Sequence, residues 1–112
     1  MEKRILIVGG SPDTREQVSQ ALVRGGVRVY TAADGVGGLF QFGLVRPHVV
    51  ILDTDEWETM ERMRALSSVP IIALTAGDAS AESLNHGADF FVVKPPSLGE
   101  LRAKVQASLR RA

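Results

Sequence analysis

The chain of 112 residues contains no cysteine, which excludes disulfide bonds, thiolate catalysis and cysteine-ligated zinc. It also lacks net charge, because 13 basic residues balance 13 acidic ones, so the composition does not point to nucleic acid or an anionic membrane as a partner. Its apolar runs are too short to span a bilayer, and the first residues lead into no signal-peptide pattern. These absences predict a soluble, cytoplasmic protein that binds neither nucleic acid nor membrane.

What the sequence does contain is a regular alternation of β-rich runs and helical segments. Its length and its 45% of hydrophobic residues suit one domain, residues 1–112, with a buried core. The strand candidates are residues 4–8, 28–31, 48–53, 71–75 and 89–94. The helix candidates are residues 12–24, 35–45, 55–66, 79–86 and 98–110. This order predicts right-handed crossovers and a parallel sheet between two layers of helices.

Polar residues follow several of these strands. In a parallel α/β sheet, ligands and chemistry collect at the carboxyl ends of the strands. The residues at those ends are Gly9-Gly10-Ser11, Asp53, Thr75 and Lys94-Pro95. Each has a simpler interpretation: Asp53 as a helix N-cap, Thr75 as a turn residue and Lys94 as a charge at a strand end. Together, an acid, a hydroxyl and an amine at one edge indicate a functional site.

Four motifs occur in an order that is specific to one family. They are Val49–Asp53, Val69–Ala76, Gly87–Phe91 and Val93–Pro95. With them the chain resembles, over residues 3–110, the receiver domain of two-component response regulators. The resemblance implies a flavodoxin-like, three-layer α/β fold whose five parallel strands have the order 2-1-3-4-5. It also implies a cis peptide bond before Pro95.

The resemblance further implies roles for the residues at the sheet edge. Asp53 corresponds to the aspartate that accepts a phosphoryl group from a histidine kinase. Thr75 and Lys94 correspond to the hydroxyl and the amine that contact the phosphoryl oxygens, and Phe91 to the aromatic switch residue. The residue types suit this chemistry, because phosphoryl transfer needs cations and hydrogen-bond donors around the transferred group.

The chain departs from the family at the metal site. Where the family has an acidic pair that binds Mg²⁺, this sequence has Gly9 and Gly10, which offer only backbone oxygens. The loop after Asp53 is about six residues shorter than is usual in the family, and the segment between Thr75 and Gly87 about three. Asp55 could supply a substitute carboxylate, or it could simply begin a helix. We therefore expect a degenerate site with weak or absent Mg²⁺ binding and no other cofactor.

A further departure is an apolar stripe in the second helix. Leu39, Phe42 and Val45 have the spacing of a core-facing side. The side opposite to them carries a stripe made of Val36, Phe40 and Leu44. An exposed apolar stripe often marks a surface for a partner or for self-association, so it could be the contact of a homodimer. The alternative is a helix that is rotated or covered.

These features favour an atypical receiver domain that signals through protein contacts, with a histidine kinase or another signalling protein as its partner. An enzyme is not expected, because no nucleophile–base pair is evident and His48 and His86 lie outside the proposed site. The main alternative is a conventional phospho-acceptor modified at Asp53. A second alternative is a small anion- or nucleotide-binding module that uses Gly9-Gly10-Ser11 as its anion loop.

Overall fold

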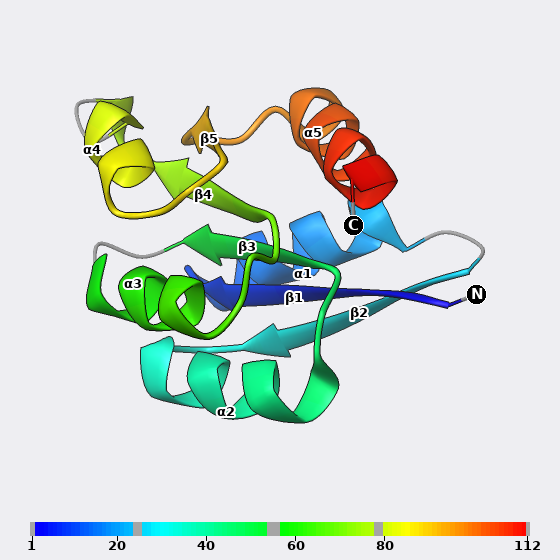
Figure 1. The fold of residues 1–112 in the computed structure, drawn as a ribbon. Helices are drawn as coiled ribbons and strands as arrows, with labels where there is room; N and C mark the ends of the chain where they lie inside the picture. Colours follow the sequence, from blue (N-terminus) through cyan, green and yellow to red (C-terminus); the bar gives the residue numbers. More distant parts are fainter. Residues whose placement is uncertain (1, 24–25, 54–56, 78–79, 112) are drawn as a thin grey trace.

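The computed structural model describes residues 2–23, 26–53, 57–77 and 80–111, which form alternating strands and helices (Figure 1). The strands are β1 (Lys3–Gly9), β2 (Val27–Ala32), β3 (Val49–Asp53), β4 (Ile71–Thr75) and β5 (Phe90–Val93). The helices are α1 (Pro12–Leu22), α2 (Gly35–Val45), α3 (Trp57–Leu66), α4 (Ser80–Asn85) and α5 (Leu98–Arg111). No helix in these ranges is long and apolar enough to cross a membrane.

All five strands are parallel and lie in the order β2-β1-β3-β4-β5. This confirms the predicted flavodoxin-like fold class and strand order. Several predicted elements are shorter in the structure: β3 starts at Val49 rather than at residue 48, α4 ends at Asn85 rather than at residue 86, and β5 starts at Phe90 rather than at residue 89. Helix α1 ends at Leu22 because the backbone of Val23 is extended, with φ −67° and ψ 116°. Strand β5 ends at Val93, next to the cis peptide bond between Lys94 and Pro95 that the resemblance implied.

The core consists of two apolar clusters, one on each face of the sheet. Alternate strand residues point to opposite faces, so Leu6 and Ile7 belong to different clusters. One cluster includes Phe42 of α2 and both Met60 and Met63 of α3. The other includes residues of α1 and α5, which cover the opposite face (Figure 1). Because both faces are covered, β1, β3 and β4 are nearly continuous apolar runs.

Helix α2 is fixed in orientation by a close approach to β1. A Cβ atom at Gly38 would lie 2.6 Å from a methyl group of Val8, so only glycine allows this spacing. Phe42, one turn further along, is buried in the core. The side chain of Asp34 accepts a hydrogen bond from the N–H of Gly37 at 2.8 Å and caps the helix. The helix is therefore not rotated, and Val36, Phe40 and Leu44 lie on the surface.

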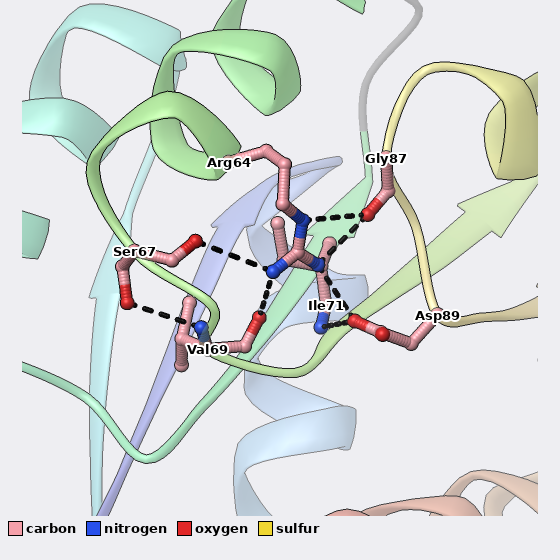
Figure 2. Close-up of polar contacts among 6 residues, drawn as sticks. All are labelled: Arg64, Ser67, Val69, Ile71, Gly87 and Asp89. Carbon is pink, nitrogen blue, oxygen red and sulfur yellow. Dashed lines mark hydrogen bonds and ion pairs between the residues drawn. The ribbon is translucent and has the colours of Figure 1, made fainter.

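An arginine network, which we call the Arg64 clamp, lies at the amino ends of β4 and β5 (Figure 2). The guanidinium of Arg64 donates to the carbonyls of Ser67, Val69 and Gly87 and to Oδ2 of Asp89, using all five of its N–H groups. The Arg64–Asp89 contact measures 2.6 Å, and the two side chains are only 28% and 26% exposed. The same Oδ2 accepts the N–H of Ile71 at 2.8 Å. The clamp thus joins α3, the start of β4 and the loop before β5.

The one tryptophan of the chain lies at the junction of α3 and the end of α4. The ring of Trp57 stacks on that of His86, with centroids 5.1 Å apart and an angle of 1° between the planes. Two carboxylates flank the imidazole: Glu61 lies 2.6 Å from Nδ1, and Glu82 lies 3.6 Å from Nε2. His86 therefore connects the start of α3 to the end of α4.

His48 joins the start of β3 to β1. The N–H of Arg4 donates to Nδ1 of His48 at 2.9 Å, and the N–H of His48 donates to the carbonyl of Arg4 at 2.7 Å. Because Nδ1 accepts a hydrogen bond, the imidazole is neutral in this arrangement. Burial, followed by the charges of Arg4 and Lys3, lowers the pKa of His48 below its ordinary value of 6.5.

We therefore expect His48 to make the protein less stable in mild acid. Because the folded state binds this proton less readily than the unfolded state, the contribution of His48 to stability is complete above pH 6.5. It is lost as the pH falls from there towards the lowered pKa. Urea unfolding across this range measures the effect. His48→Asn keeps a hydrogen-bond acceptor without a titrating ring, so it should flatten the pH dependence, and an unchanged slope would contradict the assignment.

Candidate functional site

The site is built around an ion pair between Asp53 and Lys94. Asp53 is the last residue of β3, and its side chain is only 7% exposed. Lys94 directly follows β5, and its Nζ lies 2.8 Å from Oδ1 of Asp53. The structure therefore brings together the acid and the amine that the sequence placed at the carboxyl edge of the sheet. A buried carboxylate depends on a cationic partner such as Lys94, since an unpaired charge at this depth is costly.

Thr75 lies at the same edge but contacts a residue that sequence reasoning did not single out. Its side chain is buried, and its Oγ1 lies 3.1 Å from Oγ of Ser80, at the start of α4. Its carbonyl accepts the N–H of Lys94 at 2.8 Å, which ties the lysine backbone to the end of β4. Thr75 thus connects the site to α4 through its side chain and to Lys94 through its main chain.

Gly9 and Gly10 pack directly against Asp53. Both have positive φ angles, +85° and +77°, a conformation that residues with side chains rarely adopt. A Cβ atom at Gly9 would lie 2.1 Å from the carbonyl oxygen of Asp53, and one at Gly10 would lie 2.5 Å from its Oδ2. The two glycines therefore do more than leave the site without two carboxylates. Their backbone occupies space that an acidic pair in the same conformation would need for its own Cβ atoms.

Arg15 of α1 holds this glycine loop from the side. Its NH1 donates to the carbonyl of Gly10 at 2.6 Å and to that of Gly9 at 3.3 Å. Sequence reasoning missed Arg15, although one signal was available. A cation close to a helix N-terminus opposes the helix dipole, so its presence at the fourth residue of α1 suggests a compensating contact. The loop thus receives a positive charge from the chain itself.

The described residues around Asp53 do not fit a magnesium ion. Mg²⁺ prefers carboxylate oxygens in near-octahedral geometry, and the contacts of Asp53 provide no second carboxylate. The carbonyls of Gly9 and Gly10 already accept hydrogen bonds from Arg15. The described residues also contain no group of three or more His, Asp or Glu side chains that could hold a metal. Asp55, the predicted substitute ligand, lies outside the described residues.

Phe91, the residue at the position of the aromatic switch, lies on β5 opposite Ala73 of β4. Its ring is half-buried and packs against the core cluster on the α2–α3 face. It also lines a surface groove of about 400 Å³ together with Leu84 of α4 and Val93. Phe91 is therefore close to α4, on the strand that leads to Lys94.

Comparisons with known proteins agree with this fold. The model of the response regulator receiver domain matches residues 5–106. The chain is 31% identical to the transcriptional regulatory protein HprR of Escherichia coli, covering 96% of this chain and 52% of that protein. It is 36% identical to the response regulator MprA of Mycobacterium bovis, covering 99% of this chain and 52% of that protein. The chain spans about half the length of these relatives.

Two solved structures are also similar. A receiver domain of a signal transduction histidine kinase from Syntrophus aciditrophicus superimposes with a TM-score of 0.87 at 26% identity, covering 98% of this chain and 92% of that one. A two-component response regulator from Clostridium difficile gives a TM-score of 0.88 at 24% identity, with 98% of both chains covered, and shows the fold. The chain belongs to the response regulator receiver domain family of two-component signalling. Its class is thus the receiver domain rather than an unrelated nucleotide-binding module.

Proposed function

We propose that this chain is an atypical receiver domain that signals through protein contacts, with weak or no Mg²⁺-dependent phosphorylation. The observation that carries the proposal is the glycine loop. Gly9 and Gly10 follow a backbone path that excludes the metal-binding acidic pair, and Arg15 provides a fixed cation beside them. A receiver domain with glycines and an arginine at this loop lacks the carboxylate ligands that a divalent ion would use.

The alignment with MprA supports the interpretation that this chain has shortened loops. That alignment runs over 120 residues, which is eight more than the 112 of this chain, so the relative has residues that this chain lacks. The sequence places such a shortening just after Asp53, where the family supplies a further metal ligand. Changes on two sides of one site favour a function that does not depend on the metal.

Conventional phospho-acceptance at Asp53 is the second candidate, and the Asp53–Lys94 contact favours it. Lys94 already lies 2.8 Å from the carboxylate that would accept the phosphoryl group, and Thr75 lies at the end of the neighbouring strand. In that case the phosphorus–nitrogen bond of a phosphohistidine, or the bond to the leaving group of a small phosphodonor, breaks as the bond to an Asp53 oxygen forms.

Intact mass after treatment with a small acyl phosphodonor separates the two candidates. We expect little or no added phosphoryl group, and no increase when Mg²⁺ is added. Asp53→Asn is the control, because it preserves the shape of the side chain and removes the acceptor oxygen. A stoichiometric mass increase that needs Mg²⁺ and disappears in Asp53→Asn would establish conventional activity and overturn the proposal.

The proposed partners are inferred from the family to which the chain belongs, and not from a pocket in the structure. We propose a histidine kinase or another signalling protein as the partner, and no catalytic activity of the domain itself. The relatives HprR and MprA are a transcriptional regulatory protein and a response regulator about twice as long as this chain. A regulator of that kind would use this domain as its input module.

A further inference from the structure

Helix α2 has an apolar surface that nothing in the described part of the chain covers. Val36, Phe40 and Leu44 are 83%, 70% and 70% exposed. The helix contains no charged residue, and Gln41 is its one polar side chain. A solvated helix face normally carries charges, so a helix without any is expected to be covered. The three side chains follow one another at intervals of four residues and form a continuous ridge.

A groove lies beside this ridge, between the carboxyl ends of α2 and α3. It has a volume of about 350 Å³ and is lined by Phe42, Gly43, Arg46, Pro47, Leu66 and Ser67. A Cβ atom at Gly43 would come within 4 Å of no neighbouring atom in the part of the chain that the structure describes, so the groove is open on the side of α2. Leu66 is another of the large exposed apolar residues. Phe40, which projects, and Gly43, which leaves space, are one turn apart on the same surface.

We propose that this surface is the contact between two copies of the chain, in which Phe40 of each copy enters the groove beside Gly43 of the other. A twofold contact requires one patch to hold both the projecting group and the recess that receives it, and α2 meets this condition. Antiparallel α2 helices related by an axis between residues 41 and 42 would pair position 40 with position 43. The same axis would pair position 36 with position 47.

The charges favour a second copy over other occupants. A twofold contact places identical side chains close together, and the uncharged ridge on α2 avoids the repulsion that like charges would cause. Arg46, the one charged residue that lines the groove, would lie opposite position 37 of the other copy rather than opposite its own counterpart. The chain also has no net charge, so two copies do not repel at long range. An interfacial membrane helix would normally carry lysine or arginine on its polar face, and α2 has neither. The proposal is independent of whether Asp53 is phosphorylated.

The absence of cysteine allows a direct test by crosslinking. Phe40→Cys and Gly43→Cys are prepared separately, mixed and oxidised gently without any phosphodonor. We expect a disulfide-linked dimer that contains one chain of each kind and forms faster than either single variant alone. A mixture of Phe40→Cys with Val23→Cys is the matched control, because Val23 is an exposed apolar residue on the other face of the sheet. Equal crosslinking in both mixtures would overturn the proposal.

Sedimentation of the unmodified chain gives an independent readout. We expect a concentration-dependent dimer that Phe40→Asp converts to a monomer with an unchanged far-ultraviolet spectrum. Gly43→Leu fills the groove without adding charge and should also give a monomer. Val23→Asp should remain a dimer. A wild-type chain that is monomeric at every accessible concentration, or a dimer that persists in Phe40→Asp, would rule out this contact and leave the surface to an unlike partner.

Discussion

Replacing Arg64 by methionine should lower the free energy of unfolding by about 3–5 kcal/mol, because it leaves the partly buried carboxylate of Asp89 without its cation. The carbonyls of Ser67, Val69 and Gly87 lose donors in the same step. Such a loss is a large fraction of the 5–15 kcal/mol that is typical of a domain. Urea unfolding at neutral pH measures it. Arg64→Lys should be nearly as damaging, since an ammonium cannot reproduce the planar set of five donors.

Arg62 provides the matched control on the same helix. Its guanidinium pairs with Glu58 at 2.9 Å, but both side chains are well exposed. Exposed pairs of this spacing contribute about 0.3–0.5 kcal/mol, so Arg62→Met should change stability by no more than that. If Arg64→Met cost as little as Arg62→Met, the clamp would not stabilise the fold. A double variant with Asp89→Asn should recover part of the loss, because it removes the unpaired charge.

Replacing Gly9 by alanine should destabilise the protein by about 2–5 kcal/mol, the sum of two separate costs. The positive φ angle contributes about 1–2 kcal/mol. The new Cβ atom, 2.1 Å from the backbone oxygen of Asp53, adds the cost of moving the main chain of β1 or β3. Urea unfolding is again the measurement. Gly9→Asp, which restores one acid of the family, should be at least as destabilising in the absence of metal.

Gly26→Ala separates the two costs. Gly26 has a similar φ angle of +81°, but a Cβ atom there would meet no atom of the described residues within 4 Å. This variant should therefore lose only the conformational part, about 1–2 kcal/mol. Equal losses in Gly9→Ala and Gly26→Ala would show that the loop can move away from Asp53. The steric argument against the acidic pair would then fail.

Most of the fold could be predicted from the sequence because several signals agreed. Apolar runs bounded by turn residues located the strands, and each predicted strand and helix overlaps one in the structure. The order of the strands in the sheet came from the family resemblance, which rests on motifs such as Gly87–Phe91. The Arg64 clamp gives a physical reason for part of that motif, since Gly87 and Asp89 are both partners of Arg64.

The sequence predicted which residues lie at the site, but not the contacts that hold them or the path of the backbone. Strand ends located Asp53 and Lys94, because parallel strands bring their carboxyl ends to one edge. The partners of the loop were not predictable, since Arg15 and Ser80 act through contacts that depend on the path of the backbone. The same holds for Gly9 and Gly10. Their composition indicated a missing pair of acids, whereas their φ angles show that the loop itself follows a path suited to glycine.

The stacked pair of Trp57 and His86 has a practical consequence for all of these measurements. Because the chain contains one tryptophan, its intrinsic emission comes essentially from a single contact, between the start of α3 and the end of α4. Fluorescence therefore records the α3–α4 junction without any label. Far-ultraviolet dichroism records the whole chain, and agreement between the two is a test of two-state unfolding.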